Sequence, residues 1–78
     1  MSVENAVKEV FNKVLDVAPE EIKPEVTLDK AFGVDSTEMV EISVGLKKRF
    51  GINIGDNELK KTHSFSQIVE ILKSKGAQ

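Results

Sequence analysis

Hydrophobic residues recur at helical spacing in three separate stretches of the chain, with charged and amide residues between them. In the first stretch the apolar positions are Val3, Val7, Val10, Phe11, Val14 and Leu15. Ser2 is suited to cap a helix that starts here, and Pro19 prevents the helix from continuing past Ala18. The pattern therefore predicts a helix over Val3–Asp16.

The second stretch begins with a cap signal. If Asp35 is the N-cap, Glu38 falls at the third helical position, and the two side chains can form a capping box. The apolar positions that follow are Met39, Val40, Ile42, Val44, Leu46 and Phe50. Gly51 is placed for a left-handed C-cap, so the pattern predicts a helix over Ser36–Phe50.

A second capping box, Ser64 with Gln67, precedes the third stretch, which predicts a helix over Phe65–Lys75. A short helical turn is expected at Asp56–Lys60. The long connection from Pro19 to Val34 is expected to be held down by its own apolar residues, with room for a short turn near Leu28–Phe32. No segment alternates with period two for long enough to be a strand. We therefore expect an all-α fold, a small four-helix bundle with one short helix and a long first loop, as a single domain over residues 1–78.

Composition excludes several classes of function. The chain has no cysteine, which rules out disulfides, thiolate metal sites and a cysteine nucleophile. Its net charge is −2 and its aromatic residues are four Phe, so it lacks the basic surface and stacking residues of a nucleic-acid binder. No apolar run approaches the ~20 residues that span a membrane. His63 is the single histidine, so neither a metal site nor a general base is expected around it, and we expect it at the surface.

Ser36 is the candidate for covalent chemistry. Because Asp35 already fits the cap, the Ser36 hydroxyl is not needed there and should point outward beside the free N–H groups of the helix start. A helix N-terminus favours an anion at this place. The pattern therefore favours a phosphodiester on this hydroxyl.

The chain resembles the acyl carrier protein family from about Val3 to Lys75. The residues that carry the resemblance are Gly33-Val34-Asp35-Ser36, Val40-Glu41-Ile42, Leu46 and Phe50. In that family a serine after Gly-x-Asp bears a 4′-phosphopantetheine arm, so the resemblance implies that Ser36 is the attachment site, with Asp35 as part of the motif. Thr37 departs from the family pattern, which usually has Leu there.

The resemblance also implies a function and partners. A phosphopantetheinyl transferase would move the arm from coenzyme A to Ser36 with Mg²⁺. The arm would then carry acyl groups as thioesters between acyl synthase, ligase or transferase enzymes of fatty-acid or related lipid or polyketide biosynthesis. The chain itself would be a non-catalytic, monomeric, cytoplasmic carrier. Two alternatives remain open, a peptidyl or aminoacyl carrier and an unmodified helical protein-interaction module. An enzyme is the weakest option, because the sequence offers no nucleophile–base pair.

Two further groups of residues are assigned roles on this basis. The residues expected to contact partner enzymes are Glu38, Met39, Glu41, Lys47, Lys48 and Arg49. The residues expected to line an acyl pocket, between the second helix and the short turn after it, are Phe32, Val40, Leu46, Ile54, Leu59 and Ile68. The three cations that end the second helix also complement its dipole. They depart from the acidic helix that is usual in the family, so we expect a specialised carrier with partners of its own.

Overall fold

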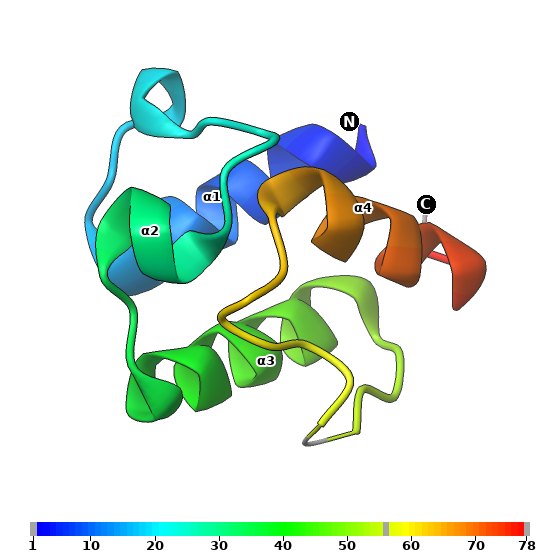
Figure 1. The fold of residues 1–78 in the computed structure, drawn as a ribbon. Helices are drawn as coiled ribbons and strands as arrows, with labels where there is room; N and C mark the ends of the chain where they lie inside the picture. Colours follow the sequence, from blue (N-terminus) through cyan, green and yellow to red (C-terminus); the bar gives the residue numbers. More distant parts are fainter. Residues whose placement is uncertain (1, 56, 78) are drawn as a thin grey trace.

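The computed structural model describes residues 2–55 and 57–77. Its elements are, in chain order, α1 (Val3–Leu15), a 3₁₀ turn at Pro19–Glu21, α2 (Leu28–Phe32), α3 (Ser36–Phe50) and α4 (Phe65–Ser74) (Figure 1). Within the described ranges there is no strand, and one isolated β-bridge joins Thr27 to Ser64. The expected all-α class with four helices is confirmed.

Capping residues set the ends of the three longer helices much as expected. The Ser2 hydroxyl accepts a hydrogen bond of 3.2 Å from the Asn5 N–H at the start of α1. That helix ends one residue earlier than predicted, because Asp16 adopts the left-handed conformation of a C-cap. Gly51 ends α3 in the same conformation, with a φ of 66° that glycine adopts without strain. The last helix, α4, ends at Ser74, and Lys75, which was predicted as its last residue, is its C-cap.

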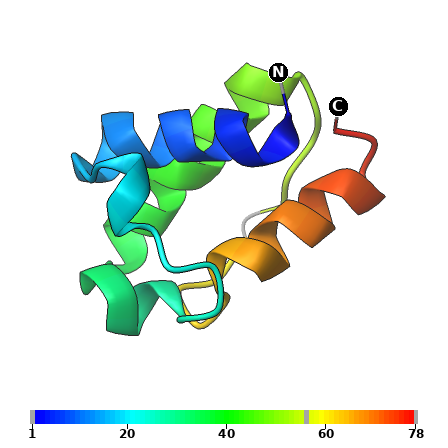
Figure 2. The same ribbon diagram turned by 90° about the horizontal axis from the view of Figure 1, so that it is seen from above.

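The core lies where α1 packs against α3 and α4 (Figures 1 and 2). Phe11 is completely buried, and its ring meets Phe65 and Phe32 edge to face, with centroids 5.8 Å and 6.4 Å away. The axes of α1 and α3 come close at Gly45, where a Cβ would lie 2.9 Å from Cγ1 of Val10. A larger residue at this position would force Val10 or the helices to shift, so the glycine lets α3 pack closely on α1.

The short helix lies in a different place from the one expected. Residues 57–60 contain no helix, only a turn in which the Glu58 N–H donates to the Gly55 carbonyl at 3.1 Å. Asp56, the expected cap of that helical turn, lies outside the described residues. Gly and Asn are poor helix formers, and a sequence this short needs outside support to become helical. The expectation of a helical turn there is therefore wrong over residues 57–60.

The short helix is α2, in the first connection. Its N-terminal N–H groups find partners far along the chain: Leu28 donates to the His63 carbonyl at 3.0 Å, and Asp29 donates to the Lys61 carbonyl at 2.9 Å. The buried Leu28 side chain anchors the helix to the core. The connection is thus packed down by its own residues, as expected, and is helical at the position where we allowed a turn.

Candidate functional site

A complete capping box starts α3. The N–H of Glu38 donates to Asp35 Oδ1 at 2.8 Å, and the N–H of Asp35 donates to Glu38 Oε1 at 3.1 Å. This confirms the predicted role of Asp35 as the cap, and it occupies both carboxylates with the backbone. Ser36 is consequently the first residue of the helix, as the sequence predicted.

Ser36 combines exposure with free hydrogen-bonding groups. Its side chain is exposed, and its hydroxyl has no hydrogen-bond partner among residues 2–55 and 57–77. Within the same residues, the N–H groups of Ser36 and Thr37 also lack an acceptor, as expected for the first turn of a helix. Such N–H groups, together with the helix dipole, favour a phosphate at this point. The site therefore fits a phosphodiester on the Ser36 oxygen.

The other serines of the chain are less suited to carry a group. Ser2 and Ser64 use their hydroxyls as N-caps. Ser43 is buried, and the Ser74 hydroxyl donates to the Ile71 carbonyl at 2.6 Å. Ser66, at the second position of α4, is half-buried. Among the described residues, exposure and a hydroxyl without a hydrogen-bond partner thus coincide at Ser36.

The turn before Ser36 sets the direction in which the chain enters α3. Gly33 is the C-cap of α2, in the left-handed region with a φ of 66°, and its N–H donates to the Asp29 carbonyl at 3.0 Å. Val34, the single residue between Gly33 and the Asp35 cap of α3, is buried and anchors this link. The Gly-x-Asp-Ser motif therefore has a local physical reason: glycine turns the chain, the apolar residue holds it, and aspartate starts the helix.

A pocket of about 490 Å³ lies beside Ser36. It is lined by Ser36, Met39, Val40, Asn57, Leu59, Lys60 and Lys61. Two of the residues predicted for the acyl pocket, Val40 and Leu59, meet here. Leu59 is buried, whereas Val40 is 61% exposed.

The structure places the remaining predicted pocket residues deeper. Leu46, Ile54 and Ile68 are buried members of the hydrophobic core, and Phe32 packs against that core from α2. None of these four lines the pocket beside Ser36. The structure therefore brings Val40 and Leu59 together with Ser36, and the other four do not line this pocket.

The segment that walls this pocket is tied to the end of α4. Lys75 forms an ion pair with Glu58, next to Leu59, and hydrogen bonding to Lys75 is the main reason that the pKa of Glu58 lies below its usual value. Both partners are partly exposed to solvent. The contact thus holds the loop of residues 57–59 in place with a modest free energy.

The predicted partner-binding residues separate into an acidic and a basic region. Glu41 is exposed, Glu38 is half-buried in the capping box, and Met39 is buried under the helix, where it lines the pocket. Lys48 and Arg49 are exposed at the other end of α3.

The basic region also includes a residue that the sequence analysis missed. Lys13 of α1 lines a pocket of about 300 Å³ together with Lys48 and Arg49. On the same face, Arg49 Nε lies 3.6 Å from Glu9 Oε2. The helical periodicity gives the exposed face of each helix but does not show that these two faces adjoin.

Lys60, Lys61 and Asn57 are pocket residues that the sequence analysis also missed. The sequence feature that could have indicated them is the basic pair Lys60-Lys61 directly after the apolar residue Leu59.

His63 is half-buried, and its Nδ1 accepts a hydrogen bond of 3.0 Å from the Lys60 N–H. In the described part of the chain, no cluster of three or more potential metal ligands occurs. In the same residues, no helix is long and apolar enough to cross a membrane.

Substitutions at Asp35 test its role as a helix cap. Asp35→Ala should lower the free energy of unfolding by ~1 kcal/mol, because the Glu38 N–H loses its acceptor. Asp35→Ser should recover most of that loss, since serine caps as well as aspartate does. Urea denaturation of the two variants measures this difference. Equal destabilisation by both variants would contradict the capping role.

The comparisons with known proteins agree with this geometry. A family model described as phosphopantetheine attachment site matches residues 5–72. The acyl carrier protein of Nitratidesulfovibrio vulgaris (strain DP4) is 31% identical over 75 residues, which cover 96% of this chain and 99% of the relative. The acyl carrier protein of Campylobacter fetus subsp. fetus (strain 82-40) is 35% identical over 72 residues, which cover 92% of this chain and 94% of the relative. The acyl carrier protein of Wolinella succinogenes is 32% identical over 74 residues, which cover 95% of this chain and 97% of the relative. The chain therefore belongs to the acyl carrier protein family, and the attachment domain for phosphopantetheine spans most of its length.

Proposed function

We propose that the Ser36 hydroxyl carries the 4′-phosphopantetheine arm and that the chain transports acyl groups as thioesters. One observation carries this assignment. Ser36 is an exposed serine at the first position of a long helix, with a disengaged hydroxyl, while the neighbouring Asp35 already fills the cap. The Gly33-x-Asp35-Ser36 order and the family membership support it.

The chain's own contribution to attachment is to present and stabilise, not to catalyse. The Ser36 oxygen would form the new bond to phosphorus and lose its proton, and the bond from that phosphorus to the nucleotide part of coenzyme A would break. A phosphopantetheinyl transferase with Mg²⁺ would supply the base. The free N–H groups of Ser36 and Thr37 and the helix dipole stabilise the resulting phosphodiester. Once attached, the arm supplies a terminal thiol that holds the acyl group.

The pocket beside Ser36 supports a shelter for the acyl chain. Met39, Val40 and Leu59 give it an apolar surface within reach of the attachment point. Each CH₂ group that moves from water into such a surface gains ~0.8 kcal/mol. Leu46, Ile54 and Ile68 belong to the same buried cluster as Met39 and Leu59, and a longer chain would reach them by displacing Leu59.

The partners follow from the carrier role. Acyl synthase, ligase or transferase enzymes would dock on α3, with Glu38 and Glu41 near the arm and Lys47, Lys48 and Arg49 at the far end. These enzymes perform the acyl chemistry, and we place the carrier with them in the cytoplasm as a monomer. Charges of this kind set the rate and register of docking more than its affinity.

Two alternatives are weaker. A peptidyl or aminoacyl carrier would use the same serine, but the relatives described above are all named acyl carrier proteins. An unmodified interaction module would have no use for an attachment domain. Incubation of the apo chain with a phosphopantetheinyl transferase and coenzyme A separates these options, because the mass should rise by one arm. A chain that stays at its apo mass, under conditions that load the Campylobacter fetus relative, would contradict the proposal.

Reversing the basic end of α3 should change the choice of partner. Lys47, Lys48 and Arg49 lie 11 to 13 residues beyond Ser36 on one helix, about 17–20 Å at a rise of ~1.5 Å per residue. This exceeds the Debye length of ~8 Å at physiological salt, so the attachment reaction should scarcely change. Changing all three to Glu should raise association with general fatty-acid synthase enzymes and lower it with the dedicated partner, by roughly tenfold or more at low salt. Stopped-flow association rates at several salt concentrations measure both effects.

A matched control tests whether position or net charge is responsible. Lys48→Glu and Lys23→Glu make the same change in charge at two exposed sites, at the end of α3 and in the first connection. Lys48→Glu should reproduce part of the triple change, and Lys23→Glu should not. If the two single variants behave alike, or if the triple variant alters neither rate, the basic end only complements the helix dipole.

A further inference from the structure

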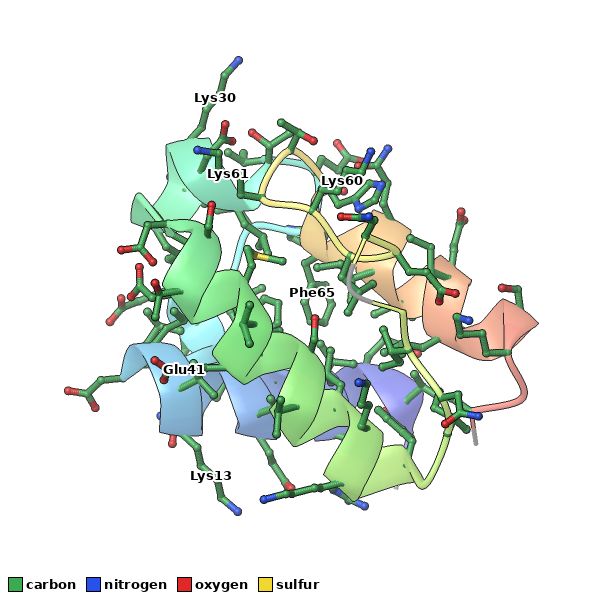
Figure 3. All side chains as sticks on the ribbon, turned by 90° about the horizontal axis from the view of Figure 1, so that it is seen from below. Lys13, Lys30, Glu41, Lys60, Lys61 and Phe65 are labelled. Carbon is green, nitrogen blue, oxygen red and sulfur yellow. The ribbon has the colours of Figure 1, made fainter. Side chains whose placement is uncertain are left out.

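Two lysines share the pocket beside the attachment serine. Lys60 and Lys61 line it together with Ser36, and both are exposed. In Figure 3, Lys30, Lys60 and Lys61 lie on the side of α3 that faces α2 and the start of α4, and Glu41 lies on the opposite side. The first turns of α3 therefore have an acidic and a basic flank, and the pocket is on the basic one.

The backbone of these lysines is fixed by hydrogen bonds to α2 and within its own turn. The Lys61 carbonyl accepts from the Asp29 N–H at 2.9 Å. The Lys60 N–H donates to His63 Nδ1 at 3.0 Å, and the Lys60 carbonyl accepts from the His63 N–H at 2.9 Å. The backbone that carries both lysines is thus held beside the pocket, so ordering their ammonium groups there costs mainly side-chain entropy.

Neither ammonium group forms an ion pair with a carboxylate within the described residues. The one carboxylate there whose pKa the Lys61 charge is found to lower is that of Asp29. Its pKa is lowered, first by the Thr27 hydroxyl that donates to it at 2.6 Å and also by the charge of Lys61. The Lys30 N–H donates to the same carboxylate oxygen at 2.9 Å, so both hydrogen bonds to this oxygen come from the turn that contains Asp29.

We propose that Lys60 and Lys61 form an anion subsite that holds a negatively charged group of the Ser36-linked arm in this pocket. The inference rests on the proposed attachment at Ser36. The anion has two sources, the phosphodiester at the serine oxygen and a carboxylate at the far end of an acyl cargo. Met39 and Leu59 supply apolar surface in the same pocket. On the opposite flank, Glu41 repels the same anion.

Lysine side-chain NMR on the full chain distinguishes the two sources. The Cε and Nζ signals of Lys60 and Lys61 are followed in the apo, holo, butyryl and succinyl forms, and intact mass verifies each form. Butyryl and succinyl groups have the same carbon count and differ in the terminal carboxylate. If the lysine signals already shift in the holo form, the bound anion is the phosphodiester. If they shift only in the succinyl form, the bound anion is the carboxylate of the cargo. In either case the shifts should exceed those of Lys23 and shrink as salt is added.

The outcomes separate this inference from the proposed function. If the chain gains no arm, the proposed function fails and the subsite fails with it. If the arm is attached but Lys60 and Lys61 move no more than Lys23 in any form, the subsite alone is overturned.

A paired substitution gives a second readout. Changing Lys60 and Lys61 together to Gln should shift the ³¹P signal of the holo form, or abolish a difference in melting temperature between the succinyl and butyryl forms. Changing Lys47 and Lys48 together to Gln, as a control, should do neither. Identical ³¹P signals and melting temperatures in the two double variants would also overturn the subsite.

Discussion

Ser36→Ala should leave the chain unable to accept a phosphopantetheine arm while its fold stays intact. The loss should be complete, because the new phosphorus bond forms at the hydroxyl oxygen that alanine lacks. Stability should change by no more than about 0.5 kcal/mol, since the side chain is exposed and Asp35 supplies the cap. Intact mass after incubation with a transferase and coenzyme A measures the loading, and urea denaturation measures the stability.

Ser66→Ala is the matched control for this prediction. Ser66 is the second residue of α4, close to a helix start that Ser64 already caps. This variant should gain one arm as the unchanged chain does. An arm on the Ser36→Ala variant, or equal loss of loading in both variants, would show that Ser36 is not the attachment site.

Phe11→Ala should produce the largest loss of stability in the chain. Phe11 is completely buried between the rings of Phe32 and Phe65. Removing its ring leaves a cavity at the contact of α1 with α4 and α2, and such changes cost ~3–5 kcal/mol. The total free energy of unfolding of a native domain is only ~5–15 kcal/mol, so the variant should be close to unfolding. Urea denaturation followed by circular dichroism measures the loss.

Phe50→Ala serves as the comparison for Phe11→Ala. Phe50 is half-buried at the end of α3 and packs against the edge of the core, so its removal should cost clearly less. If the two substitutions destabilise the chain equally, or if Phe11→Ala costs under about 2 kcal/mol, the core is not centred on Phe11.

The three longer helices and the attachment site could be predicted because their signals are local. Asp35 with Glu38 and Ser64 with Gln67 form capping boxes within four residues of sequence, and the structure contains both. The same boxes place Ser36 at the first position of α3. A cap and the apolar stripe behind it determine a helix start almost without reference to the rest of the fold.

The short helix could not be predicted because its support is not local. The first N–H groups of α2 donate to carbonyls of Lys61 and His63, more than thirty positions later in the chain. The segment of residues 57–60 has comparable local signals but lacks such partners in the described structure. Tertiary hydrogen bonds, not helix propensity, decide between the two sites.

The pocket was predicted in part, for a related reason. Periodicity shows that Val40, Leu46 and Ile68 are apolar positions of helices, but not which of them borders empty space. That depends on the path of residues 57–61, which pass beside the start of α3 and bring Leu59 and two lysines to the pocket. The lysines were missed because their chemistry becomes apparent only beside Ser36.

The most direct test of the carrier assignment is the mass of this chain purified from its native cells, followed by mapping of the modified peptide. We predict one phosphopantetheine group, free or acylated, on the peptide that contains Ser36. The same measurement identifies the acyl cargo. An unmodified chain, or an arm on a peptide without Ser36, would contradict the account.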